Sequence, residues 1–288
     1  GKLGKPVKEL VGFTKTKLLM PGEMETVSVE FAVSKMASYD DAGVTGHKSA
    51  YVLETGDYVI YAGNSVKNAK AIEVDGKETY TVAELTVTEQ LEQALAPIEG
   101  FKRMKPGEKK ADGTYTLVYE DVPVREYSLL ERIEKNLPQN LEITGNKGYK
   151  LRDVYDKKVS MEAFISQLTE EELAIIVRGE GMSSPLATPG TASAFGGVSE
   201  SLVEYGIPVA ATADGPSGIR MESGRSATQI PIGTLLAATW DAPLVEALYE
   251  KEGRELAKNQ IDLLLGPGMN IRRHPLNGRN FEYYSEDP

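Results

Sequence analysis

The sequence of 288 residues is 41% hydrophobic and 26% charged, the composition of a globular protein with room for about two domains. Its net charge of −11 and its scattered basic residues argue against nucleic acid as a partner, and no stretch is apolar enough to predict a contact with a membrane interior. With no cysteine and only two histidines, disulfides, thiolate chemistry and a multi-histidine metal site are excluded, and we expect no cofactor.

The first 80 residues are expected to form β structure. Apolar and polar side chains alternate over residues 25–33, which predicts a strand with Val27 and Val29 on one face. Residues 55–65 predict a second strand between glycine-containing turns. Strands of this length are typical of a small β-sandwich, but too few are present to close one. We therefore expect a partial sandwich, with further strands before the first residue.

Residues 81–150 are expected to connect this region to the next. They contain short apolar runs, a lysine-rich turn over residues 104–113 and one helical pattern over residues 128–137. The apolar runs predict short strands, and the region is expected to lie over the surface. The sequence therefore predicts a connector at 81–150 and no independent domain there.

From residue 151 the pattern becomes helical. Ser160 is placed to cap a helix that carries apolar residues at helical spacing. Thr169 and Glu172 form the S/T-x-x-E pattern of a capping box, and Gly179 is placed to end the second helix. Two successive helices are therefore expected before the next strand.

A strand, a capped helix and another strand follow in turn. Residues 208–212 predict a buried strand, Asp241 is placed to cap the next helix, and residues 261–265 predict a second buried strand. Such a βαβ unit makes its two strands parallel, so the loops after them lie at the same edge. We therefore expect Asp214 and Arg279, which follow these strands, to lie side by side.

Four blocks of the sequence resemble glycoside hydrolase family 3: residues 164–181, 206–220, 227–241 and 264–288, in the order and spacing of that family. Residues 5–31 resemble the fibronectin type III-like module of many such enzymes. The resemblance implies an α/β plus β fold. A partial fibronectin type III-like β-sandwich at 1–80 would precede the connector, and residues 151–288 would form the first part of a (β/α)8 TIM-type barrel.

The order of these parts resembles the circularly permuted subset of the family, in which the module precedes the barrel. That analogy implies an α/β sandwich domain before Gly1 and the rest of the barrel after Pro288. It also places the nucleophilic aspartate and the acid/base glutamate outside this chain. No catalytic residue is therefore expected here, and the chain alone is expected to be inactive. The N-terminus is not expected to be native, and the location is left open between the cytoplasm and secretion from a bacterium.

The resemblance implies that Asp214, Arg220 and Arg279 bind the sugar. A carboxylate can accept hydrogen bonds from two adjacent hydroxyls, and a guanidinium donates through a rigid fork that suits hydroxyls or a neighbouring carboxylate. The alternative for Asp214 is a turn made with Gly215 and Pro216. The alternative for the arginines is a surface ion pair, and Arg220 could also act through Asp214.

Other polar and aromatic residues favour structural roles. Glu282 is expected to be the partner of an arginine and not the catalytic acid. Trp240 lies between an apolar run and a helix cap, which favours packing in the core. His274 is expected to be a loop residue. The loop at 179–184 either lines a pocket or is an ordinary surface loop.

The resemblance thus implies a segment of a retaining β-glucosidase that hydrolyses terminal β-linked glucosyl residues. The expected partners are a β-glucoside or β-linked oligosaccharide and the remaining segments of the same enzyme, and homo-oligomerisation is left open. A non-catalytic carbohydrate-binding or adhesion module is the alternative from another class. Within the family, a β-N-acetylglucosaminidase and a β-xylosidase are the alternatives.

Overall fold

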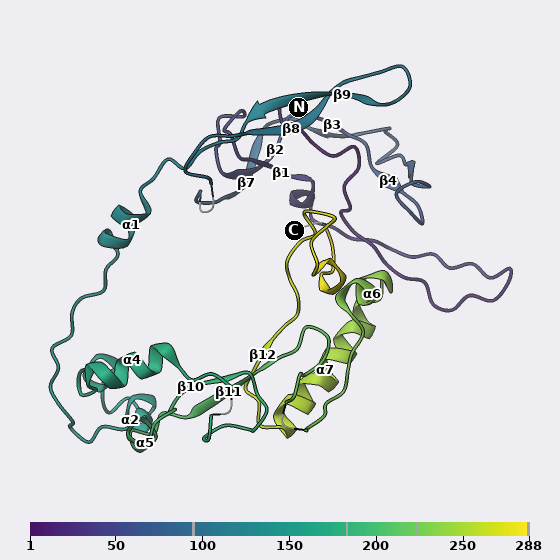
Figure 1. Ribbon diagram of the computed structural model, residues 1–288. Coiled ribbons are helices and arrows are strands. Elements are labelled where there is room, and N and C mark those ends of the chain that lie inside the picture. Colours follow the sequence, from purple (N-terminus) through teal and green to yellow (C-terminus); the bar gives the residue numbers. More distant parts are fainter. Residues whose placement is uncertain (94–95, 183, 223, 287–288) are drawn as a thin grey trace. The chain divides into compact units, whose positions relative to one another are not determined.

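The computed structural model describes residues 1–93, 96–182, 184–222 and 224–286 (Figure 1). The chain divides into two compact units. The first comprises Gly1–Phe13 and Thr26–Pro138, and the second comprises Thr14–Glu25 and Gln139–Pro288. Each unit is thus built around contacts of its own.

The first unit consists mainly of short antiparallel strands. Its largest sheet has the order β1-β2-β7, and the other strands form the pairs β3-β6, β4-β5 and β8-β9. Met36, Ala37, Leu53 and Val82 are buried together beneath these strands. The strands are β1 (Ser38–Asp40), β2 (Ala50–Leu53), β3 (Gly56–Tyr58), β4 (Tyr61–Ala62), β5 (Lys70–Ala71), β6 (Tyr80–Val82), β7 (Thr86–Gln90), β8 (Lys102–Lys109) and β9 (Tyr115–Asp121).

The strand expected at residues 25–33 is not formed. Residues 25–32 are irregular, a 3-10 helix η1 follows at Val33–Met36, and the side chains of Val27 and Val29 are exposed. Alternation fits a strand only where a neighbouring strand accepts its hydrogen bonds, and this segment has no such neighbour among the described residues. The strand expected at 55–65 is divided into β3 and β4, because the two halves pair with different strands.

The strands of residues 1–80 pair partly with strands that lie beyond residue 80. Strand β7, which completes the sheet of β1 and β2, comes from the expected connector. So do the hairpin of β8 and β9 and the helix α1 (Leu129–Lys135), which Ser128 caps. The expected boundaries at residues 80 and 150 stay predictions, whereas the compact units divide after Pro138.

The second unit contains the two helices that the capping pattern predicts. The hydroxyl of Ser160 accepts from the Ala163 N–H at the start of α3 (Met161–Ser166). Thr169 and Glu172 form the capping box of α4 (Glu170–Arg178), and Gly179 ends that helix. A short helix precedes them, and two more follow: α2 (Leu151–Tyr155), α5 (Glu200–Glu204) and α6 (Gly233–Ala238).

The predicted βαβ unit is confirmed. Strand β11 (Val209–Asp214) is parallel to β12 (Leu263–Leu265), with Asp214 opposite Leu265. The crossover contains α7 (Ala242–Lys258), capped by Asp241, whose carboxylate accepts from the Leu244 N–H at 3.1 Å. A third strand, β10 (Ser193–Gly196), pairs antiparallel with β11 and was not predicted.

The sheet of the second unit is apolar on both faces. On one face Ala213 packs with Ile219, Ile261 and Leu264. On the other face Leu263 and Leu265 are exposed.

Trp240 is 52% exposed, so the prediction that it packs in the core was wrong. It lies between α6 and α7 with a positive φ of 52°, so neither helix includes it. None of the helices in the described ranges combines the length and the apolar character that crossing a bilayer requires.

Helix α7 contains a buried carboxylate. Glu252 is 4% exposed, and neither of its carboxylate oxygens has a hydrogen-bond partner within the described structure. Burial raises the pKa of Glu252 above its usual value, and the charge of Glu255 adds to this shift. When the pKa of an acid is higher in the folded chain than in the unfolded chain, the acid favours folding in its protonated form. Its contribution to stability is complete only at a pH below the unfolded pKa. That stability is lost as the pH rises through the folded pKa.

Replacing Glu252 by glutamine is therefore expected to stabilise the chain at pH 8, and by less as the pH falls toward 4. The urea midpoint followed by circular dichroism across this pH range measures the effect. The matched control is Glu246→Gln, which alters an exposed acid of the same helix. Equal midpoints for Glu252→Gln and the unaltered chain at pH 8 would show that the buried charge costs nothing.

Candidate functional site

The loop after β11 turns tightly and carries Asp214 and Arg220 together. The Arg220 N–H donates to the Asp214 carbonyl at 2.7 Å and closes the loop. Gly218 lies within it at φ 101°, and a side chain there would meet the Thr228 carbonyl at 2.3 Å. Only glycine satisfies both conditions. The turn that the sequence predicts as a purely structural role for Asp214 is thus present. This turn also places the guanidinium of Arg220 near the Asp214 carboxylate.

The guanidinium of Arg220 lies between two carboxylates. Its Nη1 is 4.0 Å from Asp214 Oδ2, and its Nη2 is 2.9 Å from Glu222 Oε1. The Nε also donates to Glu222 at 3.0 Å. Glu222 is therefore the main partner of Arg220, and Asp214 keeps its oxygens available at the end of the strand.

Arg279 is held by Glu282 within the last described turn. The Nε of Arg279 donates to Oε1 of Glu282, whose side chain is only 9% exposed. The short helix η2 (Asn280–Glu282) places the two residues three positions apart on one turn. This hydrogen bond raises the pKa of Arg279, the charge of Glu282 raises it further, and Asp214 adds a smaller shift in the same direction.

The structure thus places Arg220 4.0 Å from Asp214, and it places Arg279 on the segment after β12, where the charge of Asp214 has a small effect on it. Asp214, Arg220 and Arg279 form the candidate cluster. Glu282 holds an arginine, as the sequence predicts, and is not free to act as an acid. The pairing of β11 with β12 explains the cluster, because both loops leave the same edge of the sheet. That these three residues bind one sugar stays a prediction.

Arg272 holds the segment that carries Arg279, and sequence reasoning missed it. Its guanidinium donates to the Thr234 hydroxyl and the Tyr283 carbonyl, both at 2.8 Å, and to the Tyr284 carbonyl at 3.1 Å. Its Nε donates to the Asn280 carbonyl at 3.2 Å. Most of these acceptors are backbone carbonyls, which no pattern of residue types reveals.

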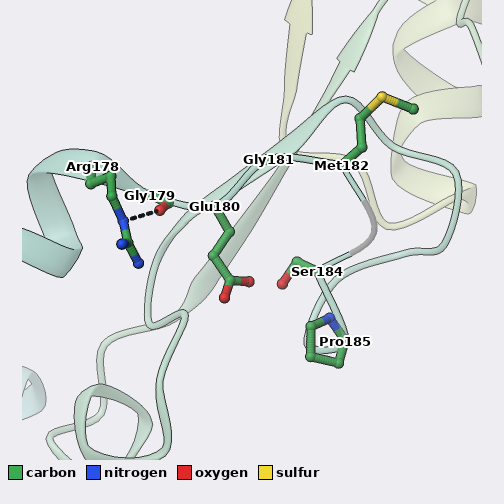
Figure 2. Close-up of a pocket in the computed structure, with 7 residues that line it drawn as sticks. All are labelled: Arg178, Gly179, Glu180, Gly181, Met182, Ser184 and Pro185. Carbon is green, nitrogen blue, oxygen red and sulfur yellow. Dashed lines mark hydrogen bonds between the residues drawn. The ribbon is translucent and has the colours of Figure 1, made fainter.

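The other residues singled out have smaller roles. The Leu276 N–H donates to His274 Nδ1 at 3.1 Å, so His274 belongs to a loop as expected. Of the loop singled out at 179–184, residues 179–182 and Ser184 line a hollow at the end of α4 (Figure 2). Within the described ranges, no three histidine or acidic side chains gather as a metal site would require.

The sequence matches two family models in succession. Residues 1–66 match the fibronectin type III-like domain, and residues 144–288 match the glycosyl hydrolase family 3 N terminal domain. The chain belongs to glycosyl hydrolase family 3. The resemblance inferred from the residues is therefore confirmed, and so is the order of the two parts.

Relatives in family 3 align with the whole of this chain. A beta-glucosidase of Ruminococcus albus is 48% identical over 287 residues, which cover 100% of this chain and 29% of that protein. Beta-glucosidase A of Butyrivibrio fibrisolvens is 36% identical over 310 residues, covering 100% of this chain and 35% of that protein. The chain thus spans about a third of the length of these relatives.

A solved structure is also similar. A crystal structure described as that of a novel beta-glucosidase from Paenibacillus barengoltzii matches with a TM-score of 0.90 and 64% sequence identity. The match covers 99% of this chain and 31% of that chain. The fibronectin type III-like domain and the family 3 N-terminal domain therefore have the folds of a family 3 protein.

Proposed function

We propose that this chain is part of a retaining β-glucosidase that hydrolyses terminal β-linked glucosyl residues. The observation that carries the proposal is the position of Asp214. It ends a strand that is parallel to β12, Arg220 lies 4.0 Å from its carboxylate, and Arg279 is on the segment that follows β12. The relatives that align with the whole chain are named beta-glucosidases, which supports the same substrate class.

In this proposal the chain binds the sugar and other segments supply the catalytic carboxylates. A retaining glycosidase needs two carboxyl groups about 5–5.5 Å apart, one as nucleophile and one as acid/base. Glu282 is engaged with Arg279, and Glu222 with Arg220. Asp214 is thus left to accept hydrogen bonds from adjacent sugar hydroxyls, while Arg220 and Arg279 orient it or donate to the sugar.

The finer description of the fold is part of the proposal. We place the partial fibronectin type III-like β-sandwich at 1–80, the connector at 81–150 and the first part of a (β/α)8 barrel at 151–288. The parallel strands β11 and β12 with α7 between them support a barrel. The exposed leucines of β12 support it too, because the strands of a closed barrel have apolar neighbours on both faces.

A chimeric enzyme tests this function. The matching segment of the Paenibacillus barengoltzii beta-glucosidase, about a third of that protein, would be exchanged for this chain. We expect the chimera to hydrolyse 4-nitrophenyl β-glucoside, because the exchanged part is 64% identical and adopts the same fold. Release of nitrophenolate measures the rate.

The controls separate the alternatives. The chain alone is expected to show no turnover, since it lacks a nucleophile and an acid/base pair. Aryl β-xyloside and aryl N-acetyl-β-glucosaminide are compared with the glucoside under identical conditions. Faster hydrolysis of either one would assign a different sugar, and turnover by the isolated chain would contradict the proposed division of roles.

A further inference from the structure

A hollow of about 350 Å³ lies where α4 ends, and the proposed glucose site does not use it. It is lined by Arg178, Glu180, Met182, Ser184 and Pro185, with two glycines between them. Figure 2 shows the carboxylate of Glu180 and the hydroxyl of Ser184 turned toward each other across it. Its size is at the lower end of the range for small-molecule pockets.

Two polar groups in this hollow are buried without a partner. Ser184 is 8% exposed, and its Oγ accepts or donates no hydrogen bond within the described part of the chain. The same is true of Glu180 Oε2. Buried polar groups in native structures nearly always have a partner, so two orphans facing one space are available to hydrogen-bond a molecule that enters it.

The charges around the hollow favour a neutral ligand. Arg178 donates through Nε to the Gly179 carbonyl at 3.3 Å, and no ion pair joins its guanidinium to Glu180 among the described residues. One carboxylate and one guanidinium therefore face the same space with opposite charges. A hydroxyl can donate to the first and accept from the second, which an anion or a cation cannot do.

The hollow lies on the opposite side of the sheet from Asp214. Glu180 forms a bridge to Ala194, and Ala194 is opposite Ala211 on β11, so these three residues share one face. Asp214 is three positions beyond Ala211, and side chains alternate along a strand. Occupancy of the hollow can therefore be measured separately from occupancy of the proposed glucose site.

We propose that this hollow binds a neutral polyhydroxylated molecule of the monosaccharide class, in addition to the site around Asp214. One hydroxyl of the ligand donates to Glu180 Oε2, and another pairs with the hydroxyl of Ser184. The guanidinium of Arg178 donates to the remaining oxygens at the exposed side. The proposal stands on this geometry and does not depend on the β-glucosidase activity.

Saturation-transfer NMR of the 288-residue chain with millimolar D-glucose tests the inference. The Asp214→Ala variant is used throughout, so that the proposed glucose site does not contribute. We expect saturation transfer to glucose in this variant, and at least a tenfold weaker affinity after the further change Glu180→Ala, because a charge-assisted hydrogen bond is lost. Ser184→Ala is expected to weaken binding severalfold.

Matched variants keep the test decisive. Glu171→Ala alters an exposed acid of α4 and is expected to leave binding unchanged. Circular dichroism checks that each variant folds. If Glu180→Ala does not fold, the binding of glucose is measured with Glu180→Gln instead. Loss of all transfer in Asp214→Ala, or equal transfer with and without Glu180, would overturn the inference. So would tighter binding of glycine, a zwitterion, than of glucose. If the chimera bound glucose through Glu180 but hydrolysed no glycoside, the proposed function would be overturned and the inference about the hollow would stand.

Discussion

Replacing Asp214 by alanine in the chimeric enzyme is expected to lower kcat/KM for 4-nitrophenyl β-glucoside roughly 100- to 1000-fold. Hydrogen bonds to the sugar hydroxyls strengthen as the ring distorts toward the transition state. Removing one such group costs about 3–4 kcal/mol in other enzymes, which corresponds to this loss of rate. Most of the loss should fall on kcat, because the bond is weaker in the ground state. Initial rates over a range of substrate concentration measure both constants.

The conservative change Asp214→Asn controls for shape. It keeps one acceptor oxygen and the size of the side chain, so we expect a smaller loss than with alanine. Near-native circular dichroism of both variants would show that the loop is intact. An unchanged kcat/KM for Asp214→Ala would remove Asp214 from the site, and a change in KM alone would make it a ground-state contact.

Replacing Arg272 by alanine is expected to be the most damaging change outside the sugar-binding cluster. Its guanidinium holds Thr234 and the carbonyls of Asn280, Tyr283 and Tyr284. Hydrogen bonds from a charged donor contribute about 1.5–3 kcal/mol each, and the change removes such a donor from each of these acceptors. The segment that carries Arg279 should therefore lose its position, and the chimera both its stability and its activity.

The neighbouring arginine provides a matched control. Arg273 is exposed, so Arg273→Ala removes the same charge from the next position without these contacts. We expect its melting temperature and its kcat/KM to stay close to those of the unaltered chimera. If both variants lost stability and activity to the same extent, the loss in Arg272→Ala would come from the removed charge and not from the contacts of Arg272.

The helices and parallel strands of the second unit could be predicted because their signals are local. A capping residue such as Ser160 or Asp241 acts on N–H groups three positions away, and the helix after it follows from apolar spacing. The strand expected at 25–33 was wrong because a strand depends on a neighbour far away in sequence. Strand β10 escaped prediction for the same reason, since its alignment with β11 is long-range.

The candidate site was predictable in part. The position of Asp214 at the end of a buried strand follows from pattern, and the resemblance to family 3 drew attention to Arg220 and Arg279. Glu282 was expected to be the partner of an arginine, and the structure identifies that arginine as Arg279. Arg272 could not be predicted, because most of its contacts are to backbone carbonyls. A pocket at residues 179–184 was one of two expectations, and the structure places a hollow there.

The tight turn after β11 restricts how this protein can diversify. Its length is fixed by the bond between the Arg220 N–H and the Asp214 carbonyl, and Gly218 admits no side chain. An insertion there would separate Asp214 from Arg220, so a library randomised over residues 215–219 should yield few folded members. New preferences for a substrate would have to arise in loops without such a constraint. Gly181, where an added Cβ meets nothing within 4 Å, lies in one of them.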